Sequence, residues 1–506
     1  MSAPESGPPG TWQYLALWQN GAVAPNATAA RLPSDDLHAA RLMLEECPGQ
    51  IRYVVPWSSW VIWDGRCHQP DSALAAEKLV SFFASRMEAV LEVVMTAERQ
   101  AAVLSLPMDV ADSERKRVVD AALEKWKPAA KYAAGLRKSA GASSLTGYLR
   151  TLAATDGSEL ESDNPEWLNC ANGTVDLRTG QIRPHNPADM LTHCLDLPYL
   201  PDAQCPQFTA MAYRMCGCDR EVFWYLLKLL GYSLIGDNRQ QKIVFISGPT
   251  GSGKSQVLYI VRSVLGALAH ESQAELITLS RHGRNARTEN SIRGKRLVTI
   301  TETSAFMTID EGQLKRITGE PVISVDQHYS KTELKTRVSW LIAIATNQMP
   351  SLVNYDAAMR RRIIVVPSGD TIPDELMDDR IAERVLASER EGILALLIRA
   401  AGEYFRTGLA MPLAVRLSTD QYAAEQNTVS NFLADATTPN AVCHIPQTEL
   451  WQEYQRWSRG EGKLGRNEFY EALKMQPGLS WDEVSRRYWG VQWNGDVAAR
   501  LQAMPR

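Results

Sequence analysis

The stretch 245-FISGPTGSGKSQV-257 lies near the middle of the 506-residue chain and fits the pattern G-x-x-x-x-G-K-[ST]. Glycines let a backbone wrap closely around phosphate oxygens and turn its N–H groups inward. The lysine of the pattern reaches the β- and γ-phosphates, and the serine hydroxyl binds Mg²⁺. The pattern therefore predicts that a nucleoside triphosphate and Mg²⁺ are bound here by Gly248, Pro249, Thr250, Gly251, Ser252, Gly253, Lys254 and Ser255.

The flanks of this loop indicate an α/β fold. Residues 242–247 form a short, β-branched apolar run that is typical of a buried strand. Residues 255–266 then repeat apolar side chains at helical spacing and end in a glycine. Phosphate binding requires this order of strand, glycine-rich turn and helix N-terminus. We therefore expect a P-loop core with a parallel sheet.

Composition limits the class of protein. The chain is 45% hydrophobic, and its eight cysteines form no C-x-x-C pair. Cys216 and Cys218 stand too close together to supply half of a zinc site, so free thiols in a reducing compartment are expected. The N-terminal MSAPESGPPG is unlike a signal peptide, and no apolar run approaches the length of a membrane span. A soluble cytoplasmic protein without a membrane partner is predicted.

The charge distribution leaves two interpretations open. A net charge of −4 argues weakly against a nucleic-acid partner. Residues 281–296, however, carry six Lys or Arg and a single acid, and a second basic group stands at 360–362. Each group is either a binding patch or an ordinary solvated surface.

Two further apolar runs end in polar residues that suit nucleotide hydrolysis. Residues 294–303 predict a strand with Glu302 at its tip, placed to polarise a water near the γ-phosphate or to hold Mg²⁺. Residues 337–350 predict another buried strand that ends in Asn347, whose amide can orient the attacking water. We expect both side chains to lie beside the phosphate loop.

An arginine triplet precedes the next predicted strand, residues 363–366. An arginine just before a strand can lie at a subunit edge and reach the γ-phosphate of a neighbour. Arg361 and Arg362 are the candidates for this role. The order of loop, acid, Asn and Arg indicates a ring-forming ATPase rather than a kinase.

A β-hairpin is predicted between the acid and the asparagine, over residues 323–340. Its tip carries His328, Tyr329, Lys331 and Lys335. In a ring, such a hairpin repeats around the central hole, where cations and an aromatic suit the phosphates and bases of a single strand. The alternative is a solvent-facing hairpin with ordinary lysines.

These motifs together resemble the superfamily 3 helicases, in particular the primase–helicases of phages, plasmids and large DNA viruses related to the poxvirus nucleoside triphosphatase. GPTGSGKS and GKRLVTITET match their Walker A and Walker B motifs, LIAIATNQMP their sensor, and YDAAMRRRIIVVP their arginine-finger segment. The resemblance extends upstream through WLNCANGTVDLRTGQIRPHNPADMLT and LLKLLGYSLIGD. It implies an AAA+-like helicase core in a hexameric, ATP-driven DNA helicase of phage or mobile-element replication. Such a helicase translocates on single-stranded DNA through its pore.

The resemblance also implies a role for individual residues. Lys254 and Ser255 take nucleotide and Mg²⁺, Glu302 is the catalytic acid that also holds Mg²⁺, and Asn347 is the sensor. Arg361 or Arg362 is the arginine finger, an ambiguity caused by the triplet. Many relatives have two adjacent acids at the Walker B, whereas this chain has one, so a second metal-holding group is Thr301 or water.

The partners implied are single-stranded and forked DNA, further copies of the chain, and a separate primase or other replication proteins. A primase module needs clustered acids such as D-x-D to hold metal ions, and the sequence contains none, so the helicase part alone is expected. Two other functions stay open. One is a ring ATPase that remodels or loads proteins, and the other is a replication initiator that mainly binds an origin.

Five regions are predicted along the chain. A small mixed α/β region at 1–75 is followed by a mostly helical linker at 76–235, the ATPase core at 236–370, a helical segment at 371–435, and a winged-helix-like domain at 436–506. The last of these carries Arg486, Arg487, Tyr488 and Trp489, which either contact DNA or, as such an aromatic stripe more often does, belong to the core.

Overall fold

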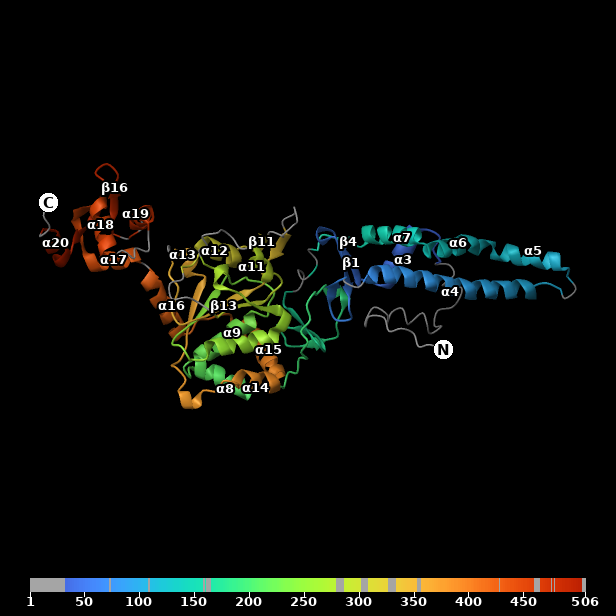
Figure 1. The fold of residues 1–506 in the computed structure, drawn as a ribbon, viewed down its shortest axis with the longest axis horizontal. Coiled ribbons are helices and arrows are strands. Elements are labelled where there is room, and N and C mark those ends of the chain that lie inside the picture. The colour runs from blue at the N-terminus through green and yellow to red at the C-terminus, as the bar shows by residue number, and fades with distance from the viewer. Residues whose placement is uncertain are drawn as a thin grey trace. The chain divides into compact units, whose positions relative to one another are not determined.

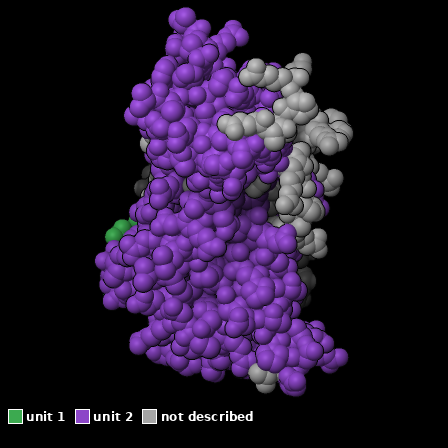
Figure 2. Space-filling model, turned by 90° about the vertical axis from the view of Figure 1, so that its left-hand side faces the viewer, with its two compact units in different colours: residues 1–200 green, residues 201–506 purple. Residues whose placement is uncertain are grey.

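The computed structural model divides the chain into two compact units, residues 1–200 and 201–506, which are coloured separately in Figure 2. It describes residues 32–502 except 72–73, 108–109, 158–159, 161–164, 279–285, 302–307, 326–333, 353–355, 427, 459–464, 475 and 477. The finer division into five regions stays a prediction. No helix in the described ranges is long and apolar enough to cross a membrane.

The first unit contains a four-stranded sheet in the order β3–β2–β1–β4. Its strands are β1 (Ile51–Val54), β2 (Ser59–Trp63), β3 (His68–Pro70) and β4 (Ala154–Thr155). A turn at Asp64 and Gly65 joins β2 to β3, where Asp64 Oδ1 accepts hydrogen bonds from the backbone N–H groups of Arg66 and Cys67 at 2.8 and 2.9 Å. These two hydrogen bonds fix the turn between the strands.

Helices pack against this sheet and against one another. They are α3 (Asp36–Glu46), α4 (Ala75–Leu104), α5 (Asp112–Leu123), α6 (Lys127–Leu136) and α7 (Ser139–Leu152). Their shared core includes Val80 of α4, Ala133 of α6 and Leu145 of α7, each at most 1% exposed. A separate antiparallel sheet follows, made of β5 (Trp167–Cys170), β6 (Gly173–Asp176) and β7 (Ile182–Arg183). Short antiparallel strands therefore follow the helices of this unit.

The second unit is built on a five-stranded parallel sheet in the order β14–β8–β13–β10–β9. The strands are β8 (Ile243–Ser247), β9 (Ala269–Glu271), β10 (Leu297–Ile300), β13 (Leu341–Thr346) and β14 (Ile363–Pro367). Their apolar runs are almost continuous because both faces of the sheet are covered. The predicted α/β fold with a parallel sheet is confirmed.

Each face of this sheet has its own helices (Figure 1). On one face, Phe245 and Ile344 belong to a buried cluster with Leu314 and with Tyr422. That layer comprises α11 (Ala286–Ser291), α12 (Glu311–Gly319), α13 (Ala357–Arg360) and α16 (Leu413–Gln426). The opposite layer comprises α8 (Pro206–Met215), α9 (Arg220–Tyr232), α10 (Lys254–Leu265), α14 (Ile381–Ser388) and α15 (Arg390–Thr407). Figure 1 shows α8, α9, α14 and α15 gathered on one side of the sheet.

The register brings the carboxyl ends of the central strands to one edge. Ser247 of β8 pairs with Thr346 of β13 on one side and with Pro367 of β14 on the other. Ile300, the last residue of β10, pairs with Ile344 of β13. The segments that follow β8, β13, β14 and β10 therefore leave the sheet side by side.

The chain ends in a smaller group of helices and strands. They are α17 (Thr428–Ala436), β15 (Thr437–Pro446), α18 (Gln447–Trp457), α19 (Arg466–Lys474), β16 (Ser480–Asp482), β17 (Arg487–Trp493) and α20 (Gly495–Gln502). The strands form an antiparallel sheet in the order β15–β17–β16. Of the two interpretations of Tyr488, the core role is confirmed, because its ring is buried and its hydroxyl donates to Tyr470 O at 3.0 Å. Arg486 and Arg487 are exposed.

Candidate nucleotide site

The phosphate-loop motif joins β8 to α10, as predicted. Helix α10 begins at Lys254, and Gly253 just before it has φ of +93°, a left-handed conformation that favours glycine. Gly248 faces a close neighbour, since a Cβ built on it would lie 2.0 Å from Ser368 Oγ. The positive end of α10 therefore faces the loop, which suits an anion.

The Lys254 side chain folds back into the loop. Its Nζ donates to Gly248 O at 2.9 Å, to Pro249 O at 2.6 Å and to Ser252 Oγ at 3.1 Å. The residue is 5% exposed, and this burial lowers the pKa of the ammonium group. Three acceptors thus hold the cation where it can exchange them for phosphate oxygens.

Ser255 lies on the first turn of α10 and is exposed. A serine hydroxyl here has the right chemistry for one oxygen ligand of Mg²⁺, an ion that keeps several waters and takes few protein ligands. Within the described ranges, no cluster of three or more His, Cys, Asp or Glu side chains could hold a metal ion. Glu302, the second expected ligand, lies outside the described residues, and its role stays a prediction.

A segment after β14 lines the loop and was missed by sequence reasoning. Ser368 Oγ lies 3.0 Å from Ser252 Oγ, and Thr371 Oγ1 donates to Thr250 O at 2.8 Å. The backbone N–H of Ile372 donates to Gly251 O at 3.1 Å. The position of this segment just after a predicted strand is the signal that could have found it, because parallel strands end at one edge.

The position before the predicted acid is described. Thr301 follows β10, and its hydroxyl donates to Glu271 Oε1 at 2.6 Å. The other oxygen of Glu271, at the end of β9, pairs with Arg262 at 2.8 Å. The hydrogen bond from Thr301 and the charge of Arg262 lower the pKa of the Glu271 carboxyl. Glu271 is thus a second carboxylate at this edge, which sequence reasoning did not identify.

Asn347 is exposed directly after β13. Because β13 lies between β8 and β10, Asn347 is between the phosphate loop and Thr301 along the edge. Thr346 beside it is 2% exposed and hydrogen-bonds through its hydroxyl to the backbone of Gln348. The structure therefore brings together the loop, Asn347 and the strand that leads to Glu302.

The three arginines before β14 have different environments. Arg360 is exposed and pairs with Asp420 at 3.1 Å. Arg361 is exposed as well. Arg362 is 7% exposed, and its Nη1 donates to Ala358 O at 2.9 Å. Burial, together with the charge of Arg361, lowers the pKa of Arg362.

The predicted hairpin is present. Strands β11 (Val322–Val325) and β12 (Leu334–Arg337) pair antiparallel, with Ser324 opposite Lys335. Lys335 therefore lies on the second strand of the hairpin. The predicted tip residues His328, Tyr329 and Lys331 lie outside the described residues.

The basic stretch 281–296 divides into two parts. Residues 281–285 are outside the described part of the chain. Lys295 Nζ donates to Ala267 O at 2.6 Å, and Arg296 donates to Leu234 O. These two cations therefore hold loops of the second unit together.

Comparison with known proteins locates two family matches. Residues 40–217 match a family described as D5 N terminal like, and residues 245–362 match a family of unknown function, DUF5906. The chain is 22% identical over 318 residues to "Putative helicase L207/L206" of Acanthamoeba polyphaga mimivirus. In these regions the chain is similar to primase–helicases of viruses and phages. The resemblance predicted from its motifs is confirmed.

The extent of these likenesses is limited. The aligned region covers 58% of this chain and 33% of the mimivirus protein, so the chain spans about a third of that relative. An apo structure of the C-terminal region of NrS-1 matches with a TM-score of 0.41 and 9% identity, covering 91% of this chain and 99% of that one. A second, A-form structure of that region has a TM-score of 0.36 and 12% identity, covering 58% and 77%. Neither structural likeness is high enough to support a conclusion.

Proposed function

We propose that this protein is an ATP-driven DNA helicase of phage or mobile-element replication that works as a hexameric ring. The observation that carries the proposal is the shared sheet edge. There the phosphate loop follows β8, and Asn347 follows the neighbouring parallel strand β13. Strand β10, parallel to β13 on its other side, leads toward Glu302. The D5 N terminal like match and the helicase name of the mimivirus relative support the same function.

The proposed hydrolysis assigns a role to each of these groups. Lys254 neutralises charge on the β- and γ-phosphates, and the N–H groups of the loop bind their oxygens. Mg²⁺ bound through Ser255 and Glu302 would neutralise further phosphate charge. Asn347 orients a water for attack on the γ-phosphorus while Glu302 accepts its proton. The bond to the leaving ADP oxygen then breaks, giving ADP and phosphate.

The ring completes the site with a residue from a neighbouring subunit. Arg361 is the side chain of the triplet that suits this role, because it is exposed while Arg362 is held by its own subunit. An arginine supplied in trans stabilises the charge that develops on the transferring phosphoryl group. The strand order β14–β8–β13–β10–β9 also supports an AAA+-like core. In this order the strand that follows Arg361, β14, lies beside β8, which leads into the phosphate loop.

DNA is bound by the hairpin in the pore. His328, Lys331 and Lys335 contact the phosphates of a single strand, and each hydrolysis event moves the hairpin along it. The elements after residue 428 form a winged-helix-like domain, in keeping with their order of helices and antiparallel strands. A separate primase or another replication protein would work beside the ring.

The proposal is tested by ATP hydrolysis with the purified full-length protein. Phosphate release is measured with Mg²⁺, alone and with an unstructured single strand or a blunt duplex. We expect strong stimulation by the single strand and weak stimulation by the duplex. Hydrolysis that does not respond to DNA would instead favour a protein remodeller. A response only to one duplex sequence would favour an origin-binding initiator.

A further inference from the structure

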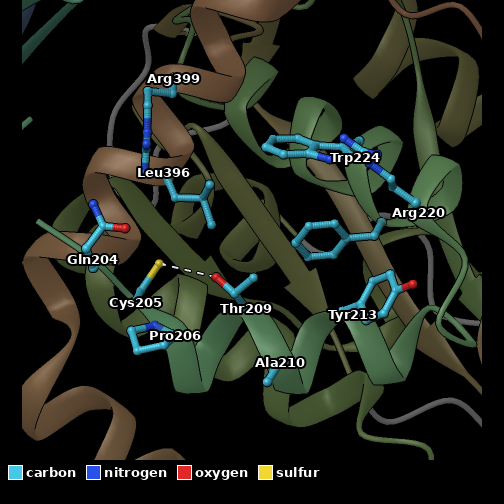
Figure 3. A pocket seen from close by; sticks show the side chains of 11 residues that line it. Gln204, Cys205, Pro206, Thr209, Ala210, Tyr213, Arg220, Trp224, Leu396 and Arg399 are labelled. Atoms are coloured by element: carbon cyan, nitrogen blue, oxygen red, sulfur yellow. Dashed lines mark hydrogen bonds between the residues drawn. The ribbon is translucent and has the colours of Figure 1, made fainter. Parts of the chain in front are cut away.

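A pocket on the second unit lies among α8, α9 and α15 (Figure 3). Its volume is about 770 Å³, within the usual range for ligand sites. None of its lining residues belongs to the phosphate loop, to the sheet edge or to the hairpin. It is therefore a separate feature from the nucleotide site.

The floor of the pocket is apolar and aromatic. Phe223 is 5% exposed, and its ring makes edge-to-face contacts with Tyr213 at 5.7 Å and Trp224 at 5.6 Å between centroids. Leu396 of α15 closes the other side. Tyr213 and Trp224 remain 36% and 42% exposed. Three rings that meet beside a cavity present far more apolar surface than a single exposed side chain does.

Two arginines flank this floor. Figure 3 shows Arg399 at one side of the pocket and Arg220 with Trp224 at the other. Both arginines are exposed, and within the described part of the chain neither guanidinium has an ion-pair partner. By contrast, Arg406 on the same helix as Arg399 is paired with Glu403.

Two nearby carboxylates, Asp219 and Glu389, are engaged with backbone N–H groups. Asp219 caps α9 by accepting hydrogen bonds from the backbone N–H groups of Glu221 and Val222 at 2.8 and 3.1 Å. The two carboxylate oxygens of Glu389 accept hydrogen bonds from backbone N–H groups on the first turn of α8, those of Gln207 and Phe208, at 2.9 Å each. The two guanidinium groups are thus available to carboxylates from outside, which they bind in bidentate fashion.

We propose that this pocket binds an acidic peptide segment of a partner protein. An apolar side chain of the segment enters the aromatic floor, and its carboxylates pair with Arg220 and Arg399. A single DNA strand fits less well, because it needs a row of cations along its path, and this pocket is lined by two cations beside an apolar floor. The assignment is independent of the helicase proposal.

The test uses a fluorescein-labelled peptide, Glu-Asp-Glu-Asp-Leu-Phe, with a free carboxyl terminus and the full-length protein. Binding is measured by fluorescence anisotropy at low salt. We expect saturable binding that Arg220→Ala, Arg399→Ala and Trp224→Ala each weaken about tenfold or more, as loss of a charge-assisted hydrogen bond or an aromatic anchor does. Arg214→Ala is the matched control, since Arg214 is an exposed arginine of α8 outside the pocket.

Several outcomes would overturn the proposal. One is that the unmodified protein does not bind the acidic peptide. Another is that the three pocket variants bind it as tightly as the control Arg214→Ala does. Equal binding of a peptide with lysines in place of the acids would exclude charge recognition. Binding of a labelled fifteen-residue oligothymidylate that depends on Arg220, Arg399 and Trp224 would make the pocket a nucleic-acid site instead. Circular dichroism of each variant confirms that the weakened binding is not caused by unfolding.

Discussion

The guanidinium of Arg362 donates from Nε to Thr318 Oγ1 at 3.2 Å, which ties the start of β14 to the end of α12. Arg361, one residue earlier, is exposed and makes no such contact through its guanidinium within the described residues. Adjacent arginines of one motif therefore have different surroundings. One is held within its own chain by hydrogen bonds, and the other is exposed at the surface.

Substitution of the exposed arginine should remove hydrolysis without loss of folding. Arg361→Ala should lower the rate by on the order of a thousandfold, because the transferring phosphoryl group loses a cation from the next subunit. Mixing this variant with Lys254→Ala under subunit exchange should restore activity at about a quarter of sites, which need an intact lysine and an intact neighbouring arginine. Phosphate release measures the rate of Arg361→Ala alone and the rate of the mixture. Exchanged rings that stay inactive would contradict a finger acting in trans.

Substitution of the buried arginine should act on stability. Arg362→Ala removes the hydrogen bonds to Thr318 and Ala358 and should lower the free energy of unfolding by about 1–3 kcal/mol. Arg360→Ala is the control, since an exposed pair such as Arg360–Asp420 contributes about 0–1 kcal/mol. Chemical denaturation followed by tryptophan fluorescence measures both variants. An equal loss of unfolding free energy in both variants would show that the burial of Arg362 has no energetic consequence.

The packing of α9 against α15 supplies a second stability test. A Cβ on Gly231 would lie 2.5 Å from Ala401 N and 2.8 Å from Ala400 C, and backbone atoms cannot move aside as a side-chain end can. Gly231→Ala should therefore destabilise the second unit by about 1–3 kcal/mol. Gly147→Ala in α7, where nothing lies within 4 Å, should stabilise by up to about 1 kcal/mol. Thermal unfolding compares the two. A stabilised Gly231 variant would refute this packing.

The hairpin lysines should affect the response to DNA and spare basal hydrolysis. We expect Lys331→Ala with Lys335→Ala to keep the rate without DNA and to lose its stimulation by a single strand. The slope of log affinity against log salt should fall in magnitude by about 0.7 for each lost phosphate contact. Anisotropy titrations over a salt series measure this slope. An unchanged slope with normal stimulation would move the DNA path away from the hairpin.

The elements around the nucleotide loop could be predicted from sequence because their patterns are local. The strand expected at 242–247 is β8 (Ile243–Ser247), and the helix expected at 255–266 is α10 (Lys254–Leu265). The strand expected at 363–366 is β14, one residue longer. Continuous apolar runs, a glycine-rich turn and helical spacing each act within a few residues, so the sequence contains them directly.

Other parts of the site depend on the order of strands, which no local pattern contains. Glu271 ends a strand of three residues, too short to be recognised, and meets Thr301 only because β9 pairs with β10. Ser368 and Thr371 reach the loop only because β14 lies beside β8. The burial of Arg362 depends in turn on Thr318, a residue distant in sequence.

Separation of a forked DNA duplex tests the helicase account most directly. A fork with a fluorophore and a quencher at its paired end is mixed with the full-length protein, ATP and Mg²⁺. We expect a fluorescence rise that requires ATP hydrolysis and is absent with Lys254→Ala. Glu302→Gln should likewise give no rise while still binding a fluorescent ATP analogue, because it removes the base and leaves the phosphate loop intact. A protein that hydrolyses ATP in response to single-stranded DNA but never separates the fork would contradict the account.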